Sequence, residues 1–134
     1  MPYLLDSDFV IDYLEEMPGA TRIYPELSRE GIAVSVVTFM EAYEGTLVAD
    51  DPAAALVKLN DLLRAALPLD FDREIATVCG ALRVRLRSES KRVNPRAHDL
   101  QIAATAIFYG LTLVTRNVAD YLDVGVTLRQ YTQQ

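Results

Sequence analysis

The sequence predicts a three-layer α/β/α fold with a central parallel sheet, and three observations lead to this prediction. Short apolar segments typical of buried strands, beginning with Tyr3-Leu4-Leu5, alternate with longer segments of helical periodicity. The expected order is strand, helices, strand, helices, strand and helix, which is typical of parallel α/β domains. The 134 residues contain no internal repeat or linker, so we expect one domain spanning residues 1–134.

The first half of the chain contains two predicted strands and the helices that follow them. We expect buried strands at 3–5 and 32–37, the second because it is rich in β-branched residues. The expected helices span residues 8–16, 20–30, 38–49 and 52–66. Pro18-Gly19 separates the first two, and Pro25 could divide the second. Asp51 is a typical N-cap, because proline follows at the first helical position.

The second half continues the alternation. We expect a very short strand at 68–70, a strand at 111–114 and a weak last strand at 124–128. A long helix is expected from Asp72 to about Glu89, followed by a polar loop over 91–96. The next helix spans 97–109 and ends at Gly110 in left-handed geometry. Asn117 begins a short helical turn.

Composition excludes several classes of protein. The chain is 51% hydrophobic and 24% charged, which is typical of globular proteins. Its longest apolar stretch, Ile102 to Val114, is too short to span a bilayer. Met1-Pro2-Tyr3 has no basic signal-peptide region, so a cytoplasmic protein is the default expectation. Cys79 and His98 are the only residues of their types, which excludes an intrachain disulfide and a multi-histidine zinc site.

The charge pattern is uneven. The net charge of −6 argues against a protein that coats nucleic acid, but not against a nuclease, whose local charge matters more. Six basic residues fall within one short segment. They either lie on the solvated end of a helix and the loop after it, or form a patch that attracts phosphate groups or binds a partner. They are Arg83, Arg85, Arg87, Lys91, Arg92 and Arg96.

Acidic residues occur where hydrophobic segments meet polar ones. Asp6, Glu41, Asp99 and the Asn117–Asp120 pair each stand at a predicted strand end or in a predicted first helical turn. In a parallel α/β fold such positions converge at one edge of the sheet. Carboxylates gathered there repel one another unless a hard cation lies between them. The pattern therefore predicts a Mg²⁺ or Mn²⁺ site, as in metal-dependent phosphodiester hydrolases.

Each of these residues also has a structural interpretation. Asp6 could cap the next helix, although Asp8 could do so equally well and leave Asp6 for chemistry. Glu41 stands three residues after Thr38, the spacing of a capping box. Asp99 stands in the first turn of a predicted helix, where the helix dipole stabilises a negative charge.

The residues near the last predicted helices are also ambiguous. Asn117 is either an N-cap or, with Asp120, a weaker contact to the site. His98 precedes Asp99 in the same helix, so we expect its side chain to point elsewhere.

Together these residues resemble the PIN-domain family and, more narrowly, VapC-type ribonuclease toxins of toxin–antitoxin pairs. Order, spacing and length fit from end to end. The matching stretches are Leu4-Leu5-Asp6-Ser7-Asp8, Ser35-Val36-Val37-Thr38-Phe39-Met40-Glu41 with Gly45, Asp99-Leu100-Gln101-Ile102-Ala103-Ala104-Thr105-Ala106, and Leu113-Val114-Thr115-Arg116-Asn117-Val118-Ala119-Asp120-Tyr121.

The resemblance implies strand order 3-2-1-4-5, a homodimer, a cognate antitoxin, and a Mg²⁺- or Mn²⁺-dependent endoribonuclease acting on RNA. It implies that Asp6, Glu41 and Asp99 are catalytic and that Asp6 and Asp99 hold the metal. Many members have Asn where Asp8 stands and Asp where Asn117 stands. The fourth acidic position is therefore open among Asn117, Asp120 and Asp8.

Three further residues are candidates for positioning the substrate or the carboxylates. Thr38 and Thr115 could do so through their hydroxyl groups, and Arg116 could contact phosphate.

The same residues allow two other functions. In a haloacid-dehalogenase-like phosphatase, Asp6 would be the nucleophile and Asp8 the acid/base. That mechanism needs a lysine close to the two aspartates, and the chain has only Lys58 and Lys91. It would also leave Glu41 and Asp99 without a role. The third alternative is a non-catalytic interaction module, because Asn117 suits a partial loss of activity.

Overall fold

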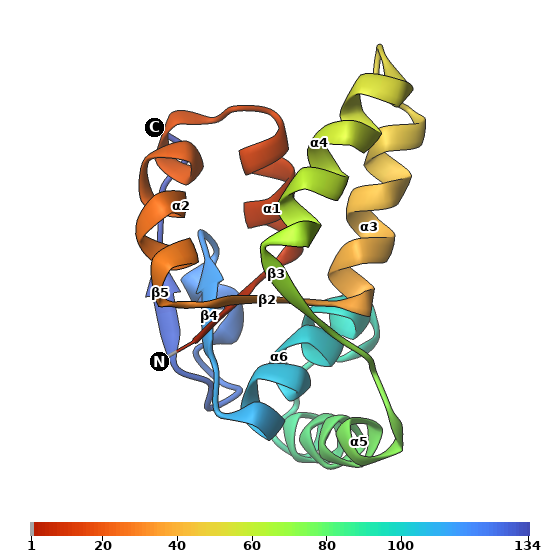
Figure 1. The fold of residues 1–134 in the computed structure, drawn as a ribbon. Coiled ribbons are helices and arrows are strands. Elements are labelled where there is room, and N and C mark those ends of the chain that lie inside the picture. Colours follow the sequence, from red (N-terminus) through yellow and green to blue (C-terminus); the bar gives the residue numbers. More distant parts are fainter. Residues whose placement is uncertain (1) are drawn as a thin grey trace.

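A computed structural model describes residues 2–134 and contains a five-stranded sheet in the order β3-β2-β1-β4-β5. All four strand pairings are parallel. The predicted fold class and strand order are confirmed (Figure 1). The strands are β1 (Tyr3–Leu5), β2 (Ile32–Ser35), β3 (Ala66–Leu69), β4 (Thr112–Thr115) and β5 (Leu128–Gln130).

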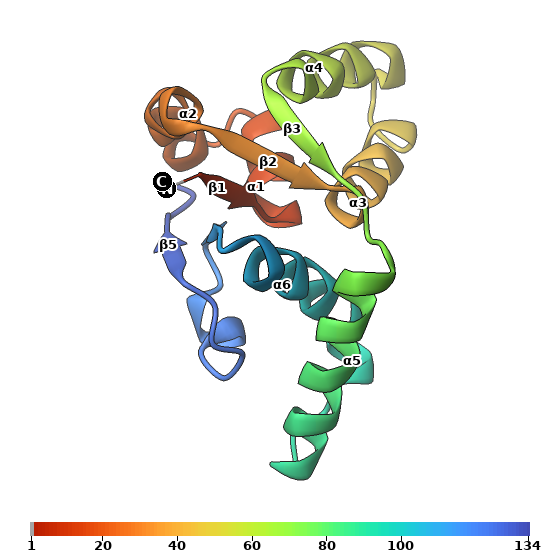
Figure 2. The ribbon, with the colours of Figure 1, turned by 60° about the horizontal axis from the view of Figure 1, so that its bottom comes forward.

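Helices cover both faces of the sheet, with α1 to α4 on one face and α5 and α6 on the other (Figures 1 and 2). The α-helices are α1 (Ser7–Leu14), α2 (Pro18–Glu30), α3 (Val36–Leu47), α4 (Pro52–Arg64), α5 (Arg73–Ser88) and α6 (Ala97–Tyr109). The chain also has two short 3₁₀ turns: η1 (Asn94–Arg96) precedes α6, and η2 (Val118–Tyr121) follows β4. No helix within residues 2–134 is long and apolar enough to cross a membrane.

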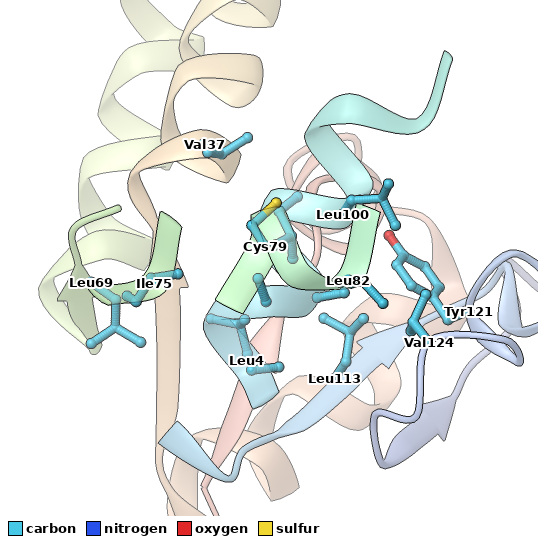
Figure 3. Close-up of a cluster of buried hydrophobic side chains, with 14 of the residues drawn as sticks. Leu4, Val37, Leu69, Ile75, Cys79, Leu82, Leu100, Leu113, Tyr121 and Val124 are labelled. Carbon is cyan, nitrogen blue, oxygen red and sulfur yellow. The ribbon is translucent and has the colours of Figure 1, made fainter. Parts of the chain in front are cut away.

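The central strands are buried on both faces because successive side chains point to opposite sides of the sheet. In β1, Leu4 packs with α5 and α6, and Leu5 packs with α1 to α4. In β4, Leu113 likewise packs on the side of α5 and α6, and Val114 packs on the side of α1 to α4. Figure 3 shows the first of these cores, where Leu4 and Leu113 meet side chains of α5 and α6. Such strands read as continuous apolar runs, which is why the sequence indicated them.

The main correction to the predicted elements concerns α3. It begins at Val36 rather than Thr38, so β2 is two residues shorter than expected. The N-cap is Ser35, whose hydroxyl accepts a hydrogen bond from the Thr38 amide at 3.1 Å. This cap outweighs the modest preference of Val36 and Val37 for strands, because propensity differences of β-branched residues are small.

Other boundaries move by a few residues. Pro18 is the first residue of α2 rather than a break before it, and Pro25 lies inside α2 without dividing it. The burial of Ala20 and Leu27 against the sheet stabilises α2 although Pro25 cannot donate a helical hydrogen bond. The expected strands at 68–70 and 124–128 are found at Ala66–Leu69 and Leu128–Gln130.

Several predicted helix ends are confirmed. Asp51 and Asp72 cap α4 and α5, accepting hydrogen bonds from the amides of Ala54 at 3.1 Å and Ile75 at 3.0 Å. Gly110 ends α6 in the left-handed conformation, with φ of 67°.

The C-terminal segment packs closely on the start of α2, and we predict that Gly19→Ala destabilises the fold. A Cβ at residue 19 would lie 1.5 Å from the carbonyl oxygen of Thr132, which is backbone and cannot rotate away. The Gly19 amide also donates to the Gln133 carbonyl at 3.0 Å. We expect a loss of roughly 1–3 kcal/mol in unfolding free energy, measured by urea denaturation.

Gly80→Ala is the matched control, since nothing lies within 4 Å of a Cβ at that position of α5. We expect it to stabilise the protein by roughly 0.5–1 kcal/mol, because alanine is the better helix former. Equal stability of the two variants would contradict the proposed close packing.

Candidate active site

Asp6 lies at the centre of the site, where β1 ends and α1 begins. The pairing of Leu5 with both Val34 and Val114 places the next residue, Asp6, level with Ser35 and Thr115. Its side chain is 3% exposed and accepts a hydrogen bond from the Phe9 amide at 2.8 Å. Asp6 is therefore the N-cap of α1, and the expectation that Asp8 would free it from this role is wrong. The Thr115 hydroxyl also donates to this carboxylate, whose two oxygens offer more lone pairs than these two hydrogen bonds use.

Burial disfavours the charged form of Asp6 and raises the pKa of its carboxyl group to about 7. The nearby charges of Asp8 and Asp99 raise the pKa further, whereas hydrogen bonds from the Thr115 hydroxyl and the Phe9 amide lower it. These contributions show that three carboxylates from α1 and α6 interact across the edge of the sheet.

Asp99 lies in the first turn of α6, as the sequence indicated. Its pKa is raised by burial and by the charges of Glu41, Asp8 and Asp120, and lowered by the Tyr121 hydroxyl. Tyr121 is almost fully buried and packs beside Leu100 and Val124 (Figure 3). Burial and the charge of Asp99 raise the pKa of Tyr121, so its hydroxyl stays a proton donor to this carboxylate.

Glu41 lies in the second turn of α3, not in the first, because α3 begins at Val36. It accepts a hydrogen bond from the Ser7 hydroxyl at 2.5 Å, and its other oxygen lies 3.2 Å from Nδ1 of His98. The capping box with Thr38 is thus wrong. Thr38 is fully buried, with its hydroxyl 3.3 Å from that of Ser7. The expectation that His98 points away from the site is also wrong.

The residues proposed for the fourth position form a linked group. The Asn117 side-chain amide donates to Asp8 at 2.6 Å, and the Asn117 backbone amide donates to the Thr115 hydroxyl at 3.1 Å. Asn117 therefore orients Asp8 and does not cap η2 through its side chain. Asp120 lies near enough for its charge to act on Asp99.

The guanidinium group of Arg116 pairs with carboxylates of α1. It forms an ion pair with buried Asp12 and lies 3.8 Å from an oxygen of Asp8. Asp12 also accepts hydrogen bonds from the Tyr131 hydroxyl at 2.7 Å and from the Gln133 side chain at 3.1 Å. We therefore assign Arg116 to anchoring α1 and the C-terminal segment rather than to phosphate.

The basic segment from Arg83 to Arg96 is partly neutralised. Arg96 pairs with Asp123 at 2.9 Å, and Arg85 pairs with Glu89 at 3.3 Å. The exposed residues Lys91 and Arg92 follow in the loop before η1.

The candidate ligand atoms are carboxylate oxygens, which are the atoms that hard divalent ions such as Mg²⁺ prefer. The repulsion that neighbouring carboxylates exert on Asp6 and on Asp99 is also what a cation would relieve. In the part of the chain that the structure describes, no three Asp, Glu, His or Cys side chains are arranged to hold one ion together. Asp6 is turned to the Phe9 amide, and Glu41 is held by Ser7 and His98. Asp6 and Asp99 are the two residues that would hold it.

The sequence profile of the PIN domain family matches residues 3–121. The chain belongs to the PIN domain family. The resemblance stated from the sequence motifs is therefore confirmed at the level of the family. No curated protein matches the chain in sequence.

Solved structures share the fold of this PIN domain. A chain of VapBC2 from Rickettsia felis, bound to a DNA fragment of its promoter, has a TM-score of 0.88 at 23% identity, covering 98% of this chain and 100% of that one. DNA-bound VapBC from Salmonella typhimurium has a TM-score of 0.86 at 24% identity, with 97% and 98% covered. VapBC-5 from Mycobacterium tuberculosis, of the VapBC family of toxin–antitoxin systems, has a TM-score of 0.71 at 25% identity, with 96% of each covered.

The PIN domain holds three site residues that motif spacing did not indicate: Ser7, His98 and Tyr121. Ser7 stands between two candidate carboxylates, and Tyr121 follows Asp120 directly. Their contacts with Glu41 and Asp99 join segments far apart in the chain, and only the fold brings these segments together.

We predict that Asp6→Asn stabilises the PIN domain at pH 8 in the absence of divalent ions. The Asp6 carboxyl has a pKa of 3.8 in the unfolded chain and about 7 in the folded one. Between these values only the folded state binds the proton, so wild-type stability falls as pH rises from about 4 to about 7. Asparagine keeps the cap but has no charge. We expect the variant to melt roughly 5 °C or more above wild type at pH 8, and the difference to vanish near pH 4.

Asp51→Asn is the matched control, because Asp51 caps α4 at the exposed surface. It should leave the melting temperature nearly unchanged at both pH values. A wild type as stable as Asp6→Asn at pH 8 would contradict a buried, destabilising charge at residue 6.

Proposed function

We propose that this PIN domain is a Mg²⁺- or Mn²⁺-dependent endoribonuclease and that it acts as the toxin of a toxin–antitoxin pair. One observation supports the activity above the others. At the carboxyl edge of the sheet, the charges of Asp8 and Asp99 raise the pKa of Asp6, and the charges of Glu41 and Asp8 raise the pKa of Asp99. Membership of the PIN domain family supports the same activity. Repulsion between buried carboxylates lowers the stability of the fold, and carboxyl groups with raised pKa values are typical of functional sites.

The roles of the individual residues follow from their contacts. Asp6 and Asp99 would hold the ion, with Asp8 as the fourth carboxylate, oriented by Asn117. When bound, the divalent ion would offset the charge of the scissile phosphate and favour deprotonation of the attacking water. Glu41 is the residue that would orient this water. Ser7 and His98 hold its side chain, and Tyr121 holds Asp99.

The phosphatase alternative has less support. Lys58, one of the two lysines, lies 3.6 Å from Glu16 and forms a surface pair with it. A phosphatase of this type would also need a late acidic motif, which Asp120 and Asp123 could supply, but Asp123 is paired with Arg96 at 2.9 Å. The family match and the positions of Glu41 and Asp99 favour the nuclease.

We predict that Asp6→Asn and Asp99→Asn each reduce cleavage of single-stranded RNA by roughly 100-fold or more, since even residues behind the ligands of a metal site contribute 10–100-fold. Both variants should keep the wild-type circular dichroism spectrum. Cleavage should stop in EDTA and return with Mn²⁺. Glu41→Gln should reduce cleavage while changing the melting temperature little, because Glu41 does not cap α3.

Glu44→Gln, an exposed change on the same helix, is the control and should cleave as wild type does. Unchanged cleavage in Asp6→Asn and Asp99→Asn would reject the assigned site. Calorimetry should detect Mn²⁺ binding to wild type and not to Asp6→Asn. No binding to either would support the non-catalytic interaction module instead.

The toxin role rests on the fold shared with chains of VapBC complexes. The proposed partner is a small antitoxin protein that inhibits the nuclease. The measurement is RNA cleavage with and without the product of the adjacent gene, and undiminished cleavage would count against this role. The cytoplasm remains the expected location.

The homodimer is proposed on the exposed apolar face of α3. This face consists of Val36, Phe39, Met40, Tyr43 and Leu47, which are 37–59% exposed. The rings of Phe39 and Tyr43 stack at a centroid distance of 5.8 Å. Apolar side chains at helical spacing on an exposed face are typical of an interface.

We predict that Tyr43→Lys converts the homodimer to a monomer, because it places a charge in the centre of this face. Sedimentation at micromolar concentration should show the mass of one chain, while Val57→Lys on α4, which is 60% exposed, should keep the dimer. A monomeric wild type would contradict the proposal.

A further inference from the structure

A polar pocket lies beside the carboxylates, between the second turn of α3 and the start of α6. Its volume is about 360 Å³, within the range of sites that bind small ligands. The side chains that line it are Glu41, Asn94, Pro95, Ala97, His98 and Asp99. Two of them, Glu41 and Asp99, belong to the candidate active site, so a ligand in this pocket would lie next to the reacting phosphate.

The hydrogen-bonding character of the pocket is set by contacts behind it. The side-chain oxygen of Asn94 accepts a hydrogen bond from Nη2 of Arg83 at 2.8 Å. Because a guanidinium group only donates, this contact assigns the oxygen of Asn94 to Arg83 and leaves its NH₂ group as a donor. Nδ1 of His98 lies 3.2 Å from an oxygen of Glu41, so this contact engages one of the two ring nitrogens.

The charge of the pocket selects among the parts of an RNA strand. Glu41 is not among the residues that would hold the ion, and its carboxylate repels a phosphate group but not a neutral base. The loop before η1 contains Lys91 and Arg92, both exposed, which attract phosphates. A strand with its phosphates along this loop would direct a base into the pocket. Such a base must be unpaired, since its edge is otherwise occupied.

We propose that this pocket, the η1 pocket, binds one unpaired RNA base next to the cleaved phosphodiester bond and so contributes to sequence specificity. The NH₂ group of Asn94 donates to an acceptor on the base edge, and Pro95 packs against the ring. The inference rests on the proposed nuclease function, because the neighbouring carboxylates define which phosphate is cleaved.

The test compares wild type with Asn94→Ala, Asn94→Asp and the control Asn60→Ala, an exposed asparagine on α4. Each protein cleaves a randomised single-stranded RNA pool with Mn²⁺, and the fragment ends are sequenced. In parallel, the same substitutions are placed in Asp6→Asn protein, which selects RNA from the pool without cleaving it. Asn94→Asp can still pair with Arg83, so it changes the donor to an acceptor without removing that contact.

Wild type should prefer particular bases at one position beside the cut. One lost hydrogen bond predicts a roughly threefold to tenfold weaker preference in Asn94→Ala. Asn94→Asp should favour bases with an amino group at that position, and Asn60→Ala should match wild type.

The outcomes separate the two proposals. Cleavage with the same base preference in all four proteins would overturn the η1 pocket and leave the nuclease standing. Absent cleavage together with an Asn94-dependent preference in the selected RNA would overturn the nuclease and support the pocket. Neither cleavage nor such a preference would overturn both.

Discussion

The burial of one carboxylate, that of Asp6, is the constraint on which the site depends. Asp6 follows the central strand β1, whose neighbours β2 and β4 end at the same level. Its oxygens are satisfied by the Phe9 amide and the Thr115 hydroxyl, neither of which is a cation. Asp8 and Asp99 add negative charge nearby. The fold thus holds an acidic group where its ionisation is unfavourable, and a bound divalent ion would remove that cost.

Two arginines near this centre pair with carboxylates that are not proposed to hold the ion. Arg116, next in sequence to two site residues, pairs with buried Asp12, and Arg96 pairs with Asp123. Ser7 and Asn117, which are uncharged, make the hydrogen bonds to Glu41 and Asp8. Among the described residues, Asp6 and Asp99 therefore have no ion-pair partner, whereas Asp8 lies 3.8 Å from Arg116 and Glu41 contacts the His98 ring. This is the arrangement that a cation site needs, because an arginine in the cleft would compete with the metal.

Much of the fold and part of the site were predictable from local patterns. Apolar runs located the central strands, Asp51 and Asp72 capped their helices, and Gly110 ended α6. The predictions were wrong where two residues could make the same local interaction. Ser35 rather than Thr38 caps α3, and Asp6 rather than Asp8 caps α1. Ser35 and Thr38 are three residues apart, Asp6 and Asp8 are two apart, and either member of each pair fits the sequence pattern of an N-cap. The residue at which β1 or β2 ends decides which of the two becomes the cap.

By itself the sequence determined the fold class, the strand order through its family motifs, and the candidate carboxylates, because buried strands and their polar ends have local signatures. Only the tertiary structure decided what surrounds those carboxylates. Ser7 meets Glu41 across 34 positions, His98 meets it across 57, and Asn117 meets Asp8 across 109. No periodicity encodes such pairs. They arise because parallel strands bring the ends of distant segments to one edge of the sheet, where side chains find their partners in space.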